Sequence, residues 1–167
     1  MAQNINIRFA NVSDLDEIVV IFNQAVRARI NGSLQEETAQ SRLDWFNSFN
    51  QNDYPIYVAE QNNRVVGYCY LSAYRAGRQA MNKVAEISYY INYNHHRQGI
   101  ASRLIKHTIN ECQRVNKNSL LAILLDKNKP SISILEKFGF KKWGCYPDII
   151  DLDGEVCSQL IYGLKLG

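Results

Sequence analysis

The stretch Val84–Leu104, VAEISYYINYNHHRQGIASRL, contains a change of hydrophobic period that decides the fold around it. β-Branched and aromatic residues dominate positions 84–91, which predicts a strand. From Ile100 to Cys112 the apolar residues recur at helical spacing, which predicts a helix. A polar turn, Asn92–Gly99, joins the two. Because the first N–H groups of a helix have no partner within it, this turn is a candidate phosphate-binding site.

Composition limits the class of protein. The chain has 167 residues, 46% of them apolar and 21% charged, which is typical of one globular domain. Its net charge of +3 is too small to indicate nucleic-acid binding by itself. No apolar run approaches the roughly 20 residues that cross a bilayer, and the N-terminus shows no signal-peptide pattern. The four cysteines have no metal-ligand spacing, and three of them sit in apolar patterns, which favours buried, reduced thiols. We therefore expect one cytoplasmic domain, residues 1–167, with no metal.

The rest of the chain alternates between the two periods. The expected strands are 5–9, 55–60, 65–73, 84–91, 119–125, 140–150 and 156–165, and the expected helices are 15–29, 35–50, 100–112 and 129–138. Ser13, followed three residues later by Asp16, resembles a helix-capping arrangement. Asn62-Asn63 and Asp153-Gly154 favour hairpin turns, and Gly67 marks a bulge or a close backbone approach. This order predicts an α/β protein with a mixed sheet and helices on its faces.

Positive charge gathers where the dipole of the predicted helix disfavours it. Arg97, Arg103 and Lys106 lie near the start of that helix. Each cation there is unfavourable by about 0.3–1 kcal/mol, and a bound anion would offset this. The alternative is a basic surface turn with Gly99 at the helix start, and spacing alone does not choose between the two.

The turn resembles motif A of the GNAT acyl-CoA N-acyltransferases, Q/R-x-x-G-x-G/A, with His96, Gly99 and Ala101 in the first, fourth and sixth positions. The segment 128–140 resembles motif B of that superfamily. Within it, the chain is most similar to the phosphinothricin and methionine sulfoximine acetyltransferase group. The matching pieces are 7–8, 23–26, 45–46, 58–60, 66–68, 74–76 and 84–91. The resemblance implies a GNAT fold, which is a mixed, mostly antiparallel central sheet flanked by helices on both faces, and acetyl-CoA as acetyl donor.

The resemblance also implies roles on the acceptor side. Glu86 would be the general base, since an ammonium must lose a proton before its nitrogen can attack. The alternative is a carboxylate on the solvent face of a strand; burial beside a cleft would raise its pKa. Arg75 would hold the substrate carboxylate through its planar donors, unless it is a solvated loop arginine. Leu34 would stand in the opposite wall of the acceptor site, where the group often has an aromatic residue.

The implied acetyl-CoA contacts come from both sides of the cleft. The strand would pair with the pantetheine arm as an added strand does, and the turn would bind the diphosphate. Asn128 would contact the pantetheine region, cap the following helix, or do both. The implied cofactor-binding residues are Tyr89, Tyr90, Ile91, His96, Arg97, Gln98, Gly99, Ile100, Ala101, Ser102, Asn128, Ser131 and Lys137. Leu135 stands where the family has a tyrosine or histidine as general acid, which predicts slower catalysis rather than its loss.

We therefore expect direct transfer of acetyl to the amine of a small amino acid or an analogue such as phosphinothricin, methionine sulfoximine or methionine sulfone. No cysteine lies in the motifs, so we expect no acyl-enzyme. Two alternatives remain open. One is another acceptor, such as a polyamine, an aminoglycoside or a protein amine; the other is a non-catalytic acyl-CoA-binding module. We expect no nucleic-acid or membrane partner. Members of the resembling group are often homodimers, so we expect a homodimer.

Overall fold

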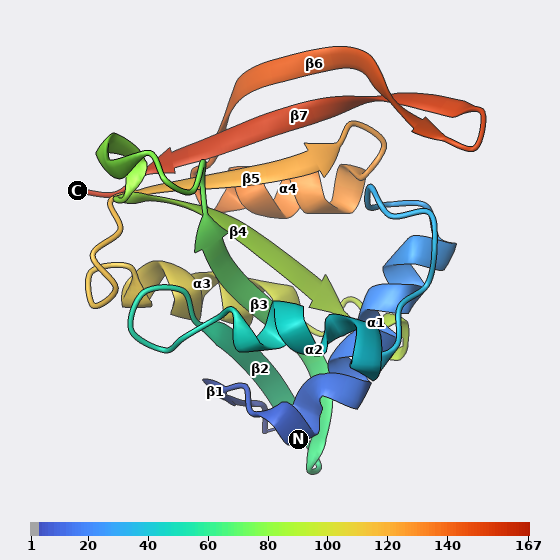
Figure 1. Ribbon diagram of the computed structural model, residues 1–167, viewed down its shortest axis with the longest axis vertical. Coiled ribbons are helices and arrows are strands. Elements are labelled where there is room, and N and C mark those ends of the chain that lie inside the picture. The colour runs from blue at the N-terminus through green and yellow to red at the C-terminus, as the bar shows by residue number, and fades with distance from the viewer. Residues whose placement is uncertain (1–3) are drawn as a thin grey trace.

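In the computed structural model, which describes residues 4–167, seven strands form one sheet in the order β1-β2-β3-β4-β5-β7-β6 (Figure 1). The first three residues of the expected domain lie outside the described residues. The strands are β1 Asn6–Phe9, β2 Ile56–Gln61, β3 Arg64–Ala73, β4 Val84–Ile91, β5 Ser119–Leu125, β6 Lys141–Leu152 and β7 Glu155–Lys165. Only β4 and β5 pair in parallel; the other neighbours are antiparallel. The expected mixed, mostly antiparallel sheet is confirmed.

Helices cover both faces of this sheet (Figure 1). They are α1 Leu15–Arg27, α2 Ala39–Asn47, α3 Ile100–Glu111 and α4 Lys129–Lys137. On one face, Ile18 and Ile21 of α1 pack with β2 and β3 beneath α2. On the other face, Leu104 of α3 and Leu135 of α4 are fully buried in a second cluster. Each such side chain stabilises the fold by about 1.5–3 kcal/mol, so the apolar stripes of the helices fix them to the sheet.

The starts of the first two helices differ from the prediction. Asn11, not Ser13, is the cap: its side chain accepts the Ser13 N–H, and the Asp14 carboxylate accepts the Asn11 N–H. The predicted role of Asp16 was therefore wrong, because the capping pair, Asn11 and Asp14, lies two residues earlier, at a short 3₁₀ helix. Thr38 caps α2 in the same way, so that helix begins after position 38 rather than at 35.

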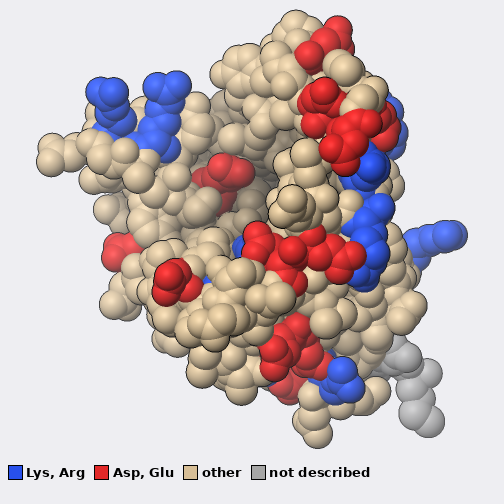
Figure 2. Space-filling view, turned by 45° about the vertical axis from the view of Figure 1, so that its right-hand side comes forward, with Lys and Arg blue, Asp and Glu red and all other residues tan. Residues whose placement is uncertain are grey.

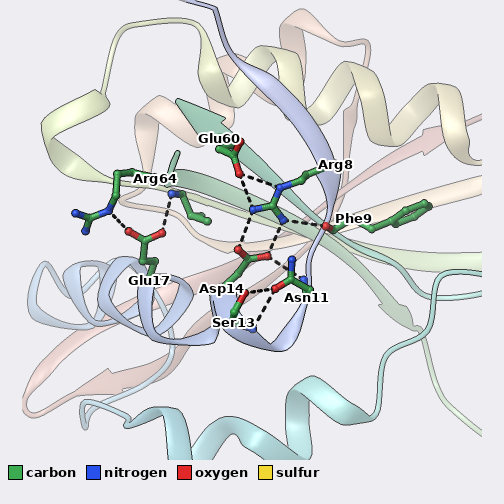
Figure 3. A network of polar contacts seen from close by, with 9 residues as sticks. Arg8, Phe9, Asn11, Ser13, Asp14, Glu17, Glu60 and Arg64 are labelled. Carbon is green, nitrogen blue, oxygen red and sulfur yellow. Dashed lines mark hydrogen bonds and ion pairs between the residues drawn. The ribbon is translucent and has the colours of Figure 1, made fainter. Parts of the chain in front are cut away.

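Arg8 ties the edge of the sheet to the start of α1 (Figure 3). Its guanidinium donates to both oxygens of Asp14, at 2.7 and 2.9 Å, and to Oε2 of Glu60, at 2.9 and 2.7 Å. Burial alone would raise the pKa of Asp14, but the hydrogen bonds from Arg8 and from the Asn11 amide hold that pKa below its usual range. The network joins β1, β2 and the helix start.

Both predicted hairpin turns are confirmed. Asn62 and Asn63 have φ of 51° and 59°, and Asp153 and Gly154 have φ of 54° and 92°, as tight hairpin turns require. Gly67 is a point of close approach: a Cβ there would lie 2.8 Å from Ile91 Cδ1 and 3.2 Å from the Tyr90 carbonyl oxygen. A side chain there would force Ile91 to move and would crowd the Tyr90 carbonyl, so glycine suits the point where β3 passes the end of β4.

All four cysteines are free, and Cys69, Cys112 and Cys157 are buried as expected, whereas Cys145 is exposed. Among the described residues, no helix has both the length and the apolar character needed to span a membrane.

Candidate active site

The sheet opens between β4 and β5 (Figure 1). The two strands pair only at Val84–Ser119, Ala85–Leu120 and Glu86–Leu121. Past Glu86, residues 87–91 pair with β3 alone, and residues 122–125 pair with β7 alone. Each strand therefore presents one edge without a partner strand, and such an edge can bind an extended ligand through its backbone groups.

A cavity of about 1050 Å³ occupies this opening. One end is formed by the starts of α3 and α4, through residues that include Gly99, Asn128 and Ser131. The other end is formed by residues 30–32 after α1 and by the β6–β7 hairpin. The surface is hollowed on the side that carries the α1–α2 connection and the end of this hairpin, and acidic atoms are visible in the hollow (Figure 2). Glu86 lines the cavity where the strands separate.

The start of α3 has the features of an anion site. Arg97 and Gly99 have φ of 59° and 76°, so the turn reverses sharply before the helix. No side chain caps α3, and its first backbone bond runs from the Arg103 N–H to the Gly99 carbonyl. The preceding amides consequently have no partner within the helix, and Gly99 and residues 100–102 line the cavity. This geometry suits a phosphate group.

Glu86 has the environment expected of a base. Its side chain is partly buried in the cavity wall, and burial raises the pKa of its carboxyl group. Burial is the cause of this shift, and no ion pair with Glu86 occurs among residues 4–167 to oppose it. A carboxylate with a raised pKa accepts a proton from an ammonium more readily than an ordinary surface glutamate does.

The cavity brings together most of the residues that the sequence singled out. Those in its lining are Glu86, Tyr89, Tyr90, Ile91, His96, Arg97, Gly99, Ile100, Ala101, Ser102, Asn128 and Ser131. Four others lie outside the lining. Gln98 is exposed in the turn, Lys137 is exposed at the end of α4, Arg75 is exposed after β3, and Leu34 is 51% exposed after α1. Ligand contacts by these four stay predictions.

The cavity wall near α4 contains Leu135, at the position where a general acid was looked for, and a pair of hydroxyl groups. Leu135 is fully buried and lines the cavity. Tyr89 Oη lies 2.5 Å from Ser131 Oγ, and this contact connects β4 to α4. Asn128 caps α4 by accepting the Ser131 N–H at 3.3 Å, and it also lines the cavity, so capping leaves it in place to contact a ligand.

Several lining residues were missed. Tyr70 and Ser88 come from strands already identified. Ser88 alternates with Glu86 on β4, which was a usable signal, and Tyr70 pairs with Ser88 from β3. Ile150 and Gln159 come from the β6–β7 hairpin, and only the strand order places that hairpin beside β5.

Comparison with known proteins agrees with this geometry. Residues 18–140 match the profile of the acetyltransferase (GNAT) family. The chain belongs to the GNAT acetyltransferase family. This GNAT chain is 32% identical to YwnH of Bacillus subtilis, provisionally named a phosphinothricin acetyltransferase, over 96% of this chain and 98% of YwnH. It is 29% identical to the L-methionine sulfoximine/L-methionine sulfone acetyltransferase of Salmonella typhimurium, over 86% of this chain and 84% of the relative.

The GNAT fold is also shared with solved structures. YncA from Salmonella typhimurium, a provisionally named acetyltransferase solved with its cofactor acetyl-CoA, superposes with a TM-score of 0.90 at 26% identity. The match covers 98% of this chain and 94% of YncA. The predicted fold and family are therefore confirmed.

Proposed function

We propose that this GNAT acetyltransferase transfers acetyl from acetyl-CoA to the primary amine of a small amino acid or an analogue of the phosphinothricin, methionine sulfoximine or methionine sulfone type. One observation carries the proposal: a single cavity joins the uncapped start of α3 to Glu86. Acetyl-CoA bound to YncA supports the donor, and the names of the relatives support the acceptor class. The chain would act as one domain over residues 1–167.

The cavity residues suit acetyl-CoA, which supplies an acetyl group activated as a thioester. The amides at the start of α3 would bind the diphosphate, and the free edges of β4 and β5 would bind the pantetheine arm. The proposed cofactor-binding residues are Tyr89, Tyr90, Ile91, His96, Arg97, Gln98, Gly99, Ile100, Ala101, Ser102, Asn128, Ser131 and Lys137.

Glu86 would accept the proton of the acceptor ammonium, directly or through a water molecule. Backbone N–H groups on the free edge of β4 would stabilise the negative charge that develops on the thioester oxygen. The acceptor nitrogen would attack directly, because none of the four cysteines lines the cavity. Burial also raises the pKa of Cys69 to about 12, which keeps that thiol protonated and unreactive.

Arg75 and Leu34 would complete the acceptor site at its rim. Ser72 of β3 pairs with Glu86, and Arg75 lies three residues further along the chain, just after β3 ends at Ala73. Its planar guanidinium would bind a carboxylate at the mouth of the cavity. Leu34 would lie in the opposite wall, on the segment that follows residues 30–32 of the lining.

We further propose a cytoplasmic homodimer. Trp143, Tyr146, Ile149 and Val156 are large apolar residues exposed on the β6–β7 hairpin, and β6 is an edge strand. Such a surface suits a second copy of the chain. The exposed thiol of Cys145 suits a reducing compartment. Light scattering during size-exclusion chromatography tests the dimer: a monomer mass across the working concentration range would contradict it.

A thiol-release assay tests the enzymatic proposal. Acetyl-CoA is offered with amino acids, with their sulfone, sulfoximine and phosphinate analogues, and with polyamines, using wild type, Glu86→Gln and Arg75→Ala. We expect release with the amino-acid analogues and a large loss in Glu86→Gln. Acetyl-CoA binding without release for any amine would make the chain a binding module, and a preference for polyamines would overturn the acceptor class.

A further inference from the structure

Unpartnered polar atoms cluster beside the acceptor end of the cavity. Among the described residues, four buried side-chain nitrogen or oxygen atoms have no hydrogen-bond partner: Asn31 Nδ2, Arg42 Nε, Tyr68 Oη and His95 Nδ1. The first three surround Tyr90. Its ring stacks on Tyr68 at 5.2 Å, and the Asn31 side chain and the Arg42 charge both lie near enough to its hydroxyl group to lower its pKa, against the rise that burial causes. Native proteins leave few buried donors unpaired, so three in one place call for an explanation.

Arg42 is a cation held in place by aromatic rings. Its guanidinium carbon lies 4.2 Å from the ring centre of Phe22 and 3.9 Å from that of Trp45. Burial raises the pKa of Tyr70 and Tyr90, and the Arg42 charge opposes that rise. A planar guanidinium in a protein usually donates to a carboxylate or phosphate, yet buried Nε donates to nothing here.

This cluster reaches the cavity close to Glu86. Asn31, Tyr70 and Tyr90 all line the cavity. Glu86, Ser88 and Tyr90 alternate on β4 and therefore share one face of the sheet, and Tyr70 pairs with Ser88. Two residues along a strand span about 7 Å, which is close to the length of a small amino acid. An acceptor with its amine at Glu86 can therefore extend toward Asn31 and Tyr70.

We propose that Asn31 contacts an unprotonated oxygen group of the acceptor. Arg42 acts as a positioning residue: its positive charge lies behind Tyr70 and Tyr90 and favours an oxygen group at this place. The group is either the α-carboxylate or an oxo group on the acceptor side chain, as in a sulfone or a phosphinate. This inference rests on the proposed function. It assigns the acceptor's oxygen atoms to a wall that is separate from Arg75 at the rim.

Matched acceptors separate the two sources of oxygen. Methionine sulfone is compared with methionine, which lacks the side-chain oxygens, and with methionine sulfone carboxamide, which lacks the α-carboxylate. Steady-state KM and kcat are measured for wild type, Asn31→Ala, Arg42→Gln and Arg42→Lys. We expect wild type to prefer the sulfone over one of the other two acceptors. Asn31→Ala should raise KM for the preferred acceptor by about tenfold or more while kcat and the KM for acetyl-CoA stay unchanged.

Arg42→Gln should reduce the same preference, and Arg42→Lys should restore part of it, which a purely structural role would not produce. Arg64→Gln, at an exposed ion pair beyond the β2–β3 turn, is the control that should leave the preference unchanged. If wild type uses all three acceptors equally, or the variants change all three alike, the donors are merely hydrated and the inference is overturned. If Arg42→Gln does not fold, Asn31→Ala decides alone. A wild type that acetylates no amine would instead refute the proposed function.

Discussion

Arg8→Ala should destabilise the protein strongly although Arg8 lies outside the active site. The substitution leaves the carboxylate of Asp14, whose side chain is only 7% exposed, without its cation (Figure 3). The hydrogen bond from the Asn11 amide remains, but it cannot neutralise the charge. Glu60, which lies on β2, also loses its partner. The variant therefore contains an uncompensated, largely buried carboxylate at the start of α1.

The expected loss can be sized from burial. Removal of one partner of a buried ion pair costs about 3–5 kcal/mol. The Arg8 side chain is 30% exposed, so water partly screens the pair, and we expect a loss near the lower end, about 3 kcal/mol. For a chain of this length, each kcal/mol lowers Tm by about 2–4 °C, which gives about 6–12 °C.

Thermal melts of wild type, Arg8→Ala and the control Arg64→Ala test this. Arg64 also pairs with a glutamate, Glu17, but its side chain is 76% exposed, so its loss should cost about 1 kcal/mol or less. The folded pKa of Asp14 is lowered, so its stabilisation is present above the unfolded pKa of about 3.9 and disappears as the pH falls toward the folded value. The difference between wild type and Arg8→Ala should shrink in acid. Equal melting of the two arginine variants at pH 7 would refute the reasoning.

Three further outcomes follow from the site. Glu86→Gln should lower kcat by about 10²–10⁴-fold without lowering Tm. The folded pKa of Glu86 is raised, so its ionisation opposes folding as the pH rises through that pKa. A wild-type rate that does not change with pH above the ordinary glutamate pKa of about 4.3 would count against this. Gly67→Ala should lower the free energy of unfolding by about 1–3 kcal/mol, because the added Cβ meets Ile91 and the Tyr90 carbonyl. It should also weaken acetyl-CoA binding, and calorimetry that shows unchanged affinity would contradict this second effect. Gly99→Ala should lower the free energy of unfolding by about 1–2 kcal/mol, because an alanine is strained at the positive φ of Gly99 and nothing lies within 4 Å of the added carbon. An unchanged Tm would disprove this.

Some boundaries could be predicted from sequence because one signal dominated them. The bounds of β4 and β5 were predicted to the residue, since β-branched and apolar runs mark both ends. The start of α1 was not, because Asn11 and Ser13 are both good caps. The pairing of Asp14 with Arg8 on a neighbouring strand selects Asn11, and this tertiary contact is invisible in a local pattern.

The same distinction holds for the site. The α3 turn and Glu86 lie in one continuous segment, so a motif and a strand pattern were enough to identify them. Asn31 and Gln159 line the same cavity although they lie far apart in sequence. Asn31 follows α1, and Gln159 reaches the cavity because the strand order places β7 beside β5. Their side chains carry no periodic or motif signal that would have indicated a shared wall.

The short parallel seam between β4 and β5 has a consequence for the unliganded enzyme. Three residue pairs hold the two half-sheets in register, so a ligand that fills the opening also joins the two halves and stabilises the fold. A ligand at 100 times its Kd adds about 2.7 kcal/mol to the free energy of unfolding. We expect amides on the open edge of β4 to exchange with deuterium faster in the empty protein. The cellular concentration of free acetyl-CoA relative to its Kd would then govern how long each molecule survives proteolysis, as well as how fast it works.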